Sequence, residues 1–508
     1  MRQRRLLLKW FAMAALMAAV LAGCNFPTRR LTLDQVMATM AAVTPVATAT
    51  LPPTPSPDPA ATSVRIIRAF PSNDPPGVPF TYTTRSGDTL QALAGRFAVG
   101  PEQIAAGSIS LTAYLPAGRQ LQIPNALDAI SPGGDLLPDA ELVYSPTAAD
   151  FDVQAFVDSA GGLLNRYTET LDDGTTRTGS AVVQRVADEN SVNPRLLLAL
   201  LEFRNGWVFG SPSSADALKY PLGFRIAGRS GLYDELTVAA NQLNLGYYGW
   251  RSGTVVDVTS PGVGTIRWNP TLNAGSVALL RLFVLLTDSD LWAQTMIGPQ
   301  GFPAFYEAMF GDAWRRAEIV GPLLPPDLSQ PALELPFAPG GRWSLTAGPH
   351  NAWTSGTPRG ALDLSPITGG DPCDVSPAWA TAAAAGLVVR AADHAVAVDL
   401  DGDGRESTGW VIFYYHLADD GMISPWVRVE TGDPLGHPSC QGGRATGKHV
   451  HVARKFNGEW LEADGPVPMT LGGWQVVADA RNYYGSLVRG GEAVTSDSGG
   501  QRGSTIWR

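Results

Sequence analysis

The sequence predicts a multidomain chain with a small βααβ module, a mainly α middle domain and an antiparallel all-β domain near the C-terminus. A chain of 508 residues is too long for one hydrophobic core. Apolar residues recur at helical spacing through its middle, and short β-type runs separated by Gly, Pro and Asp follow. We therefore divide the chain into seven segments: 1–24, 25–78, 79–125, 126–149, 150–335, 336–490 and 491–508.

The first segment, 1–24, has the features of an export signal. Four basic residues lie within the first nine positions, and an apolar run too short for a stable membrane span follows them. The run ends in LAGC, which resembles a bacterial lipobox and implies that Cys24 is lipidated. We expect a membrane-anchored lipoprotein at the cell envelope, outside the cytoplasm. An uncleaved anchor or an ordinary signal peptide remains the alternative.

Charge and cysteine content are consistent with an exported chain. The formal net charge is −10 and no basic run follows the first residues, so nucleic acid is not an expected partner. Apart from Cys24, the cysteines are Cys373 and Cys440, which could form a disulfide in an oxidising compartment. Two unpaired buried thiols are the other possibility.

Segment 25–78 includes AAVTPVATATLPPTPSPDPAATS and is expected to be a disordered, extended tether. Segment 79–125 combines a short strand, a turn in which Asp88 or Thr89 caps a helix, a second helix around 101–105 and the closing run LPAGRQLQIP. It resembles a LysM module over its whole length, which implies binding to N-acetylglucosamine-containing glycans such as peptidoglycan. A degenerate module kept as a spacer remains open. Segment 126–149 is expected to be a linker.

Segment 150–335 is predicted to be mainly helical. GSAVVQRVADENSVNPRLLLALLEFRNGW forms a helical hairpin in which Pro follows Asn at the second helix start. This stretch weakly resembles the lysozyme-like fold of lytic transglycosylases, whose second helix ends in a catalytic glutamate. Arg204 and Asn205 occupy the corresponding positions here, and Glu202 lies on roughly the opposite face of the helix. We therefore expect a groove domain without chemistry.

Three aromatic residues of this domain leave two interpretations open. Tyr247, Tyr248 and Trp250 lie close together in LNLGYYGW. They are either platforms on which sugar rings stack or ordinary core aromatics.

The runs AGLVVRAA, HAVAVDL, GWVIFYYHLAD and KHVHVARKF predict an antiparallel all-β domain over 336–490. His449 and His451 are two residues apart in the last run, so on a strand both imidazoles face the same space. His350 and Asp363 lie thirteen residues apart near the start of the domain. Imidazole and carboxylate are ligands of catalytic zinc, which takes three protein ligands and keeps one position open.

This segment resembles the lysostaphin/LytM family of zinc metallopeptidases, and most closely its beta-lytic branch. The run TGKHVH matches the family pattern Thr-Gly-x-His-x-His. Many members have a compact His-x-x-x-Asp pair, but here Arg359 lies four residues before Asp363. The long-spaced branch accounts for this difference, because His350 then takes the first ligand position.

Carried over residue by residue, the resemblance implies three zinc ligands, His350, Asp363 and His451. It makes His449 the general base or the stabiliser of the tetrahedral intermediate. His416 becomes its partner across the site, where its imidazolium form would steady the oxyanion. The implied reaction is hydrolysis of a peptide bond in peptidoglycan, either in a stem peptide or in a cross-bridge. A non-catalytic binding or regulatory protein that uses a LytM-like scaffold is the alternative.

The loop DLDGDGRES has acidic residues at the first positions of a calcium loop, namely Asp399, Asp401 and Asp403. Position twelve is Trp410 instead of an acid. An acidic hairpin turn and a weak Ca²⁺ site are both compatible with this pattern. The remaining histidines are expected to be structural or exposed: His394 and His437. The tail, 491–508, is expected to be flexible.

Overall fold

The computed structural model describes residues 78–104, 110–127, 130–260, 264–286, 295–296, 298–500 and 502–508. One compact unit contributes Thr168–Arg177 to these residues, and a second unit contains the others. The expected signal segment with Cys24, and the expected tether up to residue 77, lie outside the described residues. Among the described helices, none has the length and apolar character needed to cross a membrane.

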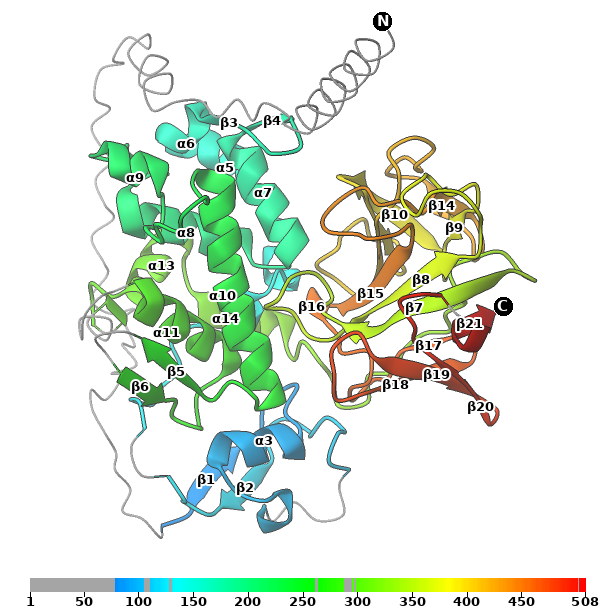
Figure 1. The fold of residues 1–508 in the computed structure, drawn as a ribbon. Coiled ribbons are helices and arrows are strands. Elements are labelled where there is room, and N and C mark those ends of the chain that lie inside the picture. Colours follow the sequence, from blue (N-terminus) through cyan, green and yellow to red (C-terminus); the bar gives the residue numbers. More distant parts are fainter. Residues whose placement is uncertain are drawn as a thin grey trace, which may run out of the picture. The chain divides into compact units, whose positions relative to one another are not determined.

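The N-terminal module consists of β1 (Phe80–Thr83), α3 (Leu90–Phe97), the 3₁₀ turn η1 (Pro101–Gln103) and β2 (Gln120–Ile123). Strands β1 and β2 pair antiparallel beside α3 (Figure 1). Thr89 caps α3 by accepting a hydrogen bond from the Ala92 amide, as one of the two expected caps. Asp88 instead accepts from the Tyr82 hydroxyl and pairs with Arg96 at 2.8 Å, so its carboxylate is part of the core. The expected second helix is only a single 3₁₀ turn over its described residues.

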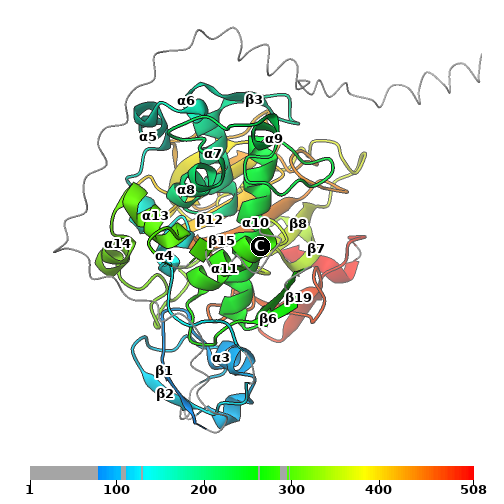
Figure 2. The ribbon, with the colours of Figure 1, turned by 90° about the vertical axis from the view of Figure 1, so that its left-hand side faces the viewer.

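The next region is largely helical, as expected. Helix α10 packs against α7 and α11, and Figure 2 shows α7, α8 and α10 close together. Its elements are α4 (Asp139–Leu142), η2 (Pro146–Ala148), α5 (Val153–Ala160), α6 (Leu163–Arg166), α7 (Gly179–Asn190), α8 (Pro194–Asn205), α9 (Ala215–Lys219), α10 (Leu232–Ser252), β5 (Asp257–Ser260), β6 (Gly264–Arg267), α11 (Ala274–Leu286), α13 (Phe302–Phe310) and α14 (Ala313–Val320).

The separate unit is a hairpin of β3 (Thr168–Thr170) and β4 (Thr176–Thr178), most of which lies within 168–177. Its turn is closed by a hydrogen bond from the Leu171 amide to the Thr175 carbonyl. The Asp173 carboxylate accepts from the Thr175 amide at 2.8 Å.

The expected linker, 126–149, contains structure that its sequence did not suggest. It includes α4, whose Glu141 is completely buried. The Glu141 carboxylate accepts a hydrogen bond from the Tyr306 hydroxyl at 2.5 Å and pairs with Arg316 at 2.7 Å. This expectation was wrong because the partners that stabilise the buried carboxylate come from more than 160 residues away in the chain.

The aromatic residues in α10 are core residues and not exposed platforms. Tyr247 and Trp250 have no solvent exposure, and Tyr248 is 7% exposed. The Tyr247 hydroxyl donates to the Glu459 carboxylate at 2.9 Å, and the Tyr248 hydroxyl accepts from the Trp460 amide at 3.0 Å. Burial of this kind removes the open face that stacking on a sugar ring requires.

The C-terminal region is built from antiparallel strands around a sheet of order β13-β10-β11-β12-β15-β8-β7-β21, with β16 paired to β15. A second sheet has the order β17-β18-β19-β20, and β9 pairs with β14. The strands are β7 (Arg342–His350), β8 (Ala361–Pro366), β9 (Ala380–Thr381), β10 (Gly386–Ala392), β11 (Ala395–Asp399), β12 (Trp410–Tyr415), β13 (Arg428–Val429), β14 (Pro434–Gly436), β15 (Val450–Phe456), β16 (Glu459–Trp460), β17 (Thr470–Leu471), β18 (Trp474–Ala478), β19 (Gly485–Arg489), β20 (Glu492–Thr495) and β21 (Thr505–Trp507).

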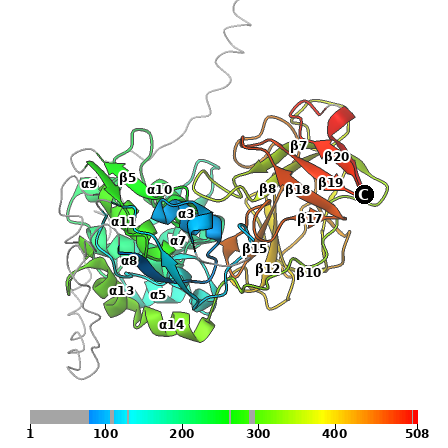
Figure 3. The same cartoon turned by 90° about the horizontal axis from the view of Figure 1, so that it is seen from below.

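The C-terminal tail is ordered by pairing. Strand β20 pairs with β19, and β21, which follows the 3₁₀ turn η3 (Arg502–Ser504), pairs with β7. Figure 3 shows β18, β19 and β20 next to β7. Val494 and Ile506 are buried in the same apolar cluster as Trp343 and Leu345. The expectation of a flexible tail was wrong because its polar composition conceals two apolar side chains that complete the core.

Candidate metal centre

Strand pairing brings three of the predicted ligands together. Asp363 on β8 is directly opposite His451 on β15, so both side chains lie on one face of the sheet. His350 is the last residue of β7, and the pairing of β7 with β8 shifts register between Ala347 and His350. Irregularities of this type re-aim side chains at the ends of strands. They bring His350 to the Asp363–His451 pair.

The ligand atoms of the three residues converge. His350 Nε2 lies 3.0 Å from His451 Nδ1, and Asp363 Oδ1 lies 3.2 Å from the former and 3.3 Å from the latter. Ligand atoms about 2.0–2.1 Å from a tetrahedral zinc are roughly 3.3 Å apart, so the spacing fits a single zinc ion. Asp363 Oδ1 is buried and receives no hydrogen bond from the described residues.

The outer nitrogen of each imidazole determines its tautomer. His350 Nδ1 lies 3.0 Å from the Gly348 carbonyl oxygen, and His451 Nε2 lies 2.9 Å from the Ala352 carbonyl oxygen. A carbonyl only accepts, so these outer nitrogens donate and the inner nitrogens present lone pairs. Two lone pairs and a carboxylate oxygen then face one another, an arrangement that a cation stabilises. The residues present therefore fit zinc.

The two histidines predicted to be catalytic lie beside this cluster. His449 Nε2 is 3.6 Å from Asp363 Oδ1, so His449 and His451 face the same space, as their two-residue spacing predicted. His416 directly follows β12, and its ring centre lies 4.5 Å from that of His449. The outer nitrogens are again held by carbonyls, His449 Nδ1 by Gly447 at 2.7 Å and His416 Nδ1 by Gln441 at 3.0 Å.

The surroundings shift the pKa values of Asp363 and His416 for different reasons. Burial alone would raise the pKa of Asp363, but the neighbouring His350 and His449 lower it well below the ordinary carboxyl value. Burial, followed by repulsion from His449, lowers the pKa of His416 to about 3. His416 is therefore neutral near pH 7, which differs from the imidazolium form expected from the sequence.

Tyr483 is a site residue that sequence reasoning missed. Its ring stacks on that of His350, with ring centres 4.7 Å apart and planes 20° from parallel, while the residue remains 53% exposed. Its backbone has a φ of 72°, which is unusual for a tyrosine and accompanies functional or turn positions. The stretch RNYYGS has no spacing that links it to His350, so only the fold reveals the contact.

Arg359 and the long loop before Asp363 also support the site. Arg359 donates to the Pro349 carbonyl at 3.2 Å and to the Arg481 carbonyl at 2.8 Å, which holds the Tyr483 loop against the end of β7. A Cβ atom at Gly356 would lie 2.4 Å from the Asn241 carbonyl oxygen, so the loop approaches α10 too closely for a larger residue. The extra length between His350 and Asp363 is thus used in contact with α10.

A disulfide joins two loops near the site. Cys373 and Cys440 are bonded, with Cα atoms 5.2 Å apart. The Lys448 ammonium, next to His449, donates to the Gly369 and Asp371 carbonyls at 3.0 Å. The bridge and the lysine together hold segment 369–373 beside the residues that lead into β15.

The other predicted candidates lie apart from this cluster. Asp399, Asp401 and Asp403 gather in the hairpin between β11 and β12, where Asp399 accepts hydrogen bonds from backbone amides of its own turn. Those bonds support the acidic-turn interpretation, and the Ca²⁺ site stays a prediction. Glu202 accepts from the Val208 and Phe209 amides, as a structural carboxylate does.

The last two histidines have structural surroundings. His394 Nδ1 lies 3.1 Å from an Asp419 oxygen, and His437 packs on Trp379 with ring centres 3.8 Å apart. Neither belongs to the candidate metal cluster of the described residues.

Comparison with known proteins relates two parts of the chain to one group of enzymes. Residues 135–325 match the family model of the LasA N-terminal domain. Protease LasA of Pseudomonas aeruginosa is 26% identical over 391 residues, covering 72% of this chain and 83% of that protein. The beta-lytic metalloendopeptidase of Achromobacter lyticus is 27% identical over 158 residues, or 30% of this chain and 39% of that protein.

A solved structure, the M23 metalloprotease pseudoalterin from the deep sea, matches with a TM-score of 0.29 and 22% identity, covering 35% of this chain and 99% of that chain. The named relatives, a protease and a metalloendopeptidase, confirm the prediction of a zinc-dependent metallopeptidase. The helical region matches the LasA N-terminal domain, and its weaker resemblance to lysozyme-like domains is not confirmed. The LysM and lipoprotein assignments stay predictions.

Proposed function

We propose that this chain is an exported zinc metalloendopeptidase that hydrolyses peptide bonds of peptidoglycan, in a stem peptide or a cross-bridge. The observation that carries the proposal is the convergence of His350 Nε2, His451 Nδ1 and Asp363 Oδ1 within 3.3 Å of one another. Each imidazole is fixed by a backbone carbonyl so that its lone pair faces the others. Relatives named as a protease and a metalloendopeptidase support the reaction type.

His350, Asp363 and His451 would hold the zinc ion. When bound, zinc lowers the pKa of water to near 7 and polarises the scissile carbonyl. The Asp363 carboxylate contributes the negative charge, and its low pKa keeps it deprotonated across the physiological range. The Gly348 and Ala352 carbonyls orient the two ligand rings, a role that outer-shell acceptors commonly have in zinc sites.

His449 is positioned to move the proton. Its Nδ1–H donates to the Gly447 carbonyl, so its Nε2 is the acceptor and faces the ligand cluster. We assign it the role of general base, which takes a proton from the attacking water and returns it to the leaving amine. His416 packs against it as a neutral imidazole and confines its ring.

Tyr483 is placed to contact the substrate. More than half of its surface is open to solvent while one face covers His350, so a peptide that reaches the ligand cluster passes this ring. Its phenol can donate a hydrogen bond to a substrate carbonyl.

We also propose how the enzyme reaches its substrate. Lipidation of Cys24 would anchor it at the cell envelope, the Pro/Thr-rich segment 25–78 would act as a tether, and the module over 79–125 would bind N-acetylglucosamine-containing glycan as LysM modules do. The LAGC motif supports the first step, and the capped turn at Thr89 supports the last.

The test is to incubate the full chain with purified peptidoglycan and follow the release of new amino groups and of reducing sugar ends. The proposal predicts new amino groups without reducing ends, and loss of that release on chelation, with recovery on adding Zn²⁺. Reducing ends without amino groups would reveal a glycosidase. No release by a folded, zinc-loaded chain would favour a binding or regulatory role.

A further inference from the structure

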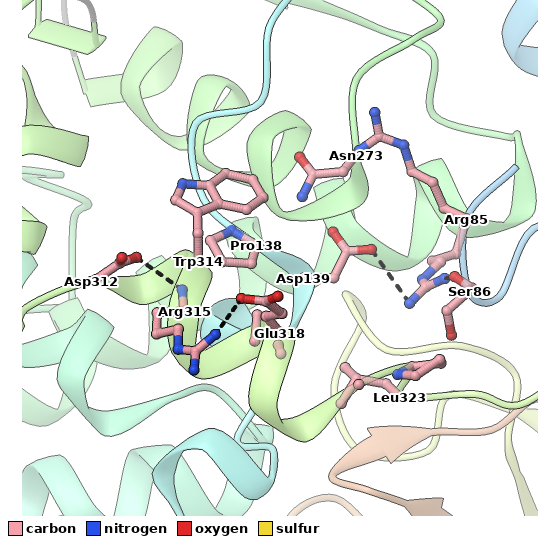
Figure 4. A pocket seen from close by; sticks show the side chains of 15 residues that line it. Arg85, Ser86, Pro138, Asp139, Asn273, Asp312, Trp314, Arg315, Glu318 and Leu323 are labelled. Carbon is pink, nitrogen blue, oxygen red and sulfur yellow. Dashed lines mark hydrogen bonds and ion pairs between the residues drawn. The ribbon is translucent and has the colours of Figure 1, made fainter. Parts of the chain in front are cut away.

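A cavity of about 620 Å³ lies beside α14, away from the candidate metal centre (Figure 4). Its charged side chains already pair with neighbouring charges: Arg315 bonds to Glu318 at 2.8 Å, and Arg85 bonds to Asp135 at 2.8 Å. These pairs balance the charge of the walls, so none of the four groups is left to select a ligand. The contacts that the proposed function leaves without a role lie instead behind His416 and His449.

Ser439 lies between β14 and β15, is completely buried, and bonds through its hydroxyl to two backbone groups. The hydroxyl donates to the His416 carbonyl at 3.0 Å and accepts from the Gln441 amide at 3.0 Å. The Gln441 carbonyl in turn accepts from His416 Nδ1 at 3.0 Å. These three hydrogen bonds form a closed cycle. The Ser439 hydroxyl therefore sets the distance between the backbone of His416 and the carbonyl that orients its imidazole.

The backbone of His416 requires support from its neighbours. Its φ is 64°, in the left-handed region that residues other than glycine adopt uncommonly. Such a conformation persists where the surrounding structure holds it. The Ser439 amide also donates to the His416 carbonyl, at 2.8 Å, so this carbonyl receives two hydrogen bonds from one residue. Ser439 thus fixes the turn from which the His416 ring projects.

The position of the Gln441 carbonyl depends on its own short turn. Gly442 and Gly443 follow it, both with positive φ, and glycine has more backbone freedom than any other residue. On its exposed side the Gln441 side chain accepts from the Asp419 amide at 3.1 Å. The bond from the Gln441 amide to the Ser439 hydroxyl is the contact that ties this turn to the buried interior.

Ser439 is also joined to His449. Its backbone forms an isolated antiparallel bridge with His449, whose ring centre lies 4.5 Å from that of His416. One buried residue is therefore fixed both to the proposed general base and to the imidazole that confines it. Such fixation affects rate, because misplacing a catalytic group by about 1 Å can cost roughly 10²-fold.

We propose that Ser439 is a positioning residue for the peptidase reaction. Its hydroxyl holds the Gln441 carbonyl and the His416 backbone in register, so that the His416 ring keeps His449 aimed at the ligand cluster. Ser439 acts through these two histidines and not on the substrate. The inference rests on the proposed function, in which His449 is the general base.

The test compares Ser439→Ala with the wild type for release of amino groups from solubilised, cross-linked peptidoglycan. The variant is expected to fold, because the backbone bond from residue 439 to the His416 carbonyl does not involve the hydroxyl. We expect kcat to fall roughly 10- to 100-fold, with KM and zinc content unchanged. Ser439→Thr restores the hydroxyl and should recover most of kcat. Failure of kcat to fall in Ser439→Ala would overturn the inference.

Ser145→Ala is the matched control. Ser145 is also completely buried, and its hydroxyl donates to the Ala140 carbonyl at 2.6 Å and accepts from the Thr147 amide at 3.2 Å. Both serines thus bond to a distant carbonyl and to the amide two residues on. Ser145→Ala should lose stability, as the loss of a buried hydrogen bond predicts, and keep the kcat of the wild type. An equal fall in kcat in both variants would show a general structural effect and overturn the inference.

A second measurement begins with the wild type and so does not require that Ser439→Ala folds. The chain has six histidines, so isotopic labelling of their ring nitrogens gives few imidazole signals in nuclear magnetic resonance spectra. In the zinc-loaded wild type, His416 Nδ1–H should be protected from exchange with solvent. Ser439→Ala should lose that protection, while the signals of His350 and His451 stay unchanged.

An unprotected His416 Nδ1–H in the wild type, or equal protection in Ser439→Ala, would overturn the inference. Failure of the proposed function would look different. A folded, zinc-loaded wild type that releases no amino groups would count against the peptidase, whereas the exchange measurement would still report whether Ser439 positions His416.

Discussion

His350 Nε2 lies 3.0 Å from His451 Nδ1, although the two residues are 101 positions apart in the chain. The contact joins the end of β7 to the start of β15, with Asp363 of β8 between them in the sheet order. The candidate metal centre is therefore a property of strand pairing. Changes that leave the sheet intact are expected to alter its chemistry without unfolding the chain.

Replacing the proposed base separates proton transfer from metal binding. His449→Gln should retain zinc, because His449 is not among the three converging ligands, and should lower kcat by roughly 10²–10⁴-fold. Zinc content by mass spectrometry and amino-group release measure the two properties. His394→Gln, at a histidine paired with Asp419, is the control and should keep activity. Loss of zinc from His449→Gln would show that the residue is a ligand.

Removing the disulfide should lower stability. Cys373 and Cys440 close a loop with a sequence separation of 67, and such a cross-link typically contributes about 2–4 kcal/mol. The double variant Cys373→Ser/Cys440→Ser is expected to melt at a lower temperature and to lose activity before it unfolds globally, because the bridged loop leads toward His449. An unchanged melting temperature would mean that Lys448 alone holds the loop.

Asp188 on α7 should make stability depend on pH. Burial, followed by the charge of the nearby Glu406, raises the pKa of Asp188 to about 7. The folded chain thus retains a proton that the unfolded chain releases above about pH 3.9, so this group lowers the free energy of unfolding as pH rises from about 4 to 7.

Asp188→Asn removes that titration and keeps an oxygen for the hydrogen bond from Gln184. The difference in melting temperature, variant minus wild type, should increase progressively from pH 4 to pH 7 and keep its higher value above pH 7. Thermal melts in a pH series measure this difference. A difference that is constant over the whole range would contradict the raised pKa of Asp188.

The Arg251–Glu459 pair joins α10 to β16 at 2.7 Å, and both side chains are buried. Glu459→Ala leaves a buried guanidinium without its closest carboxylate, which typically costs about 3–5 kcal/mol. Glu318→Ala removes an exposed partner of Arg315 and should cost about 0–1 kcal/mol. Denaturant unfolding of both variants tests the contrast, and equal losses would show that burial does not determine the cost.

The sequence was informative where local rules govern the outcome. Two-residue spacing placed His449 and His451 on the same side of a strand, and the turn before an apolar helical pattern offered Asp88 or Thr89 as the cap of α3, of which Thr89 is the cap. The sequence was uninformative where partners distant in the chain determine whether a side chain is buried or which residue it contacts. Nothing near Glu141 indicates that Tyr306 and Arg316 stabilise it inside the core, and nothing near Tyr483 indicates its stacking on His350.

Register shifts between paired strands are a second feature that could not be predicted from the sequence. The spacing of His350 and Asp363 does not reveal the shift between Ala347 and His350 that turns the histidine toward the cluster. The tail was misjudged for a related reason, because Ile506 lies in a short run that carries no strand pattern of its own and becomes a core residue only once β21 pairs with β7.

The most direct test of the account compares the full chain with His451→Ala for both bound zinc and release of amino groups from peptidoglycan. The account predicts about one zinc per wild-type chain, loss of most of that zinc in the variant, and loss of release in both the variant and the chelated wild type. Asp420→Asn, at an exposed acid, should behave as the wild type. Release that persists in a zinc-free His451→Ala chain would contradict the account.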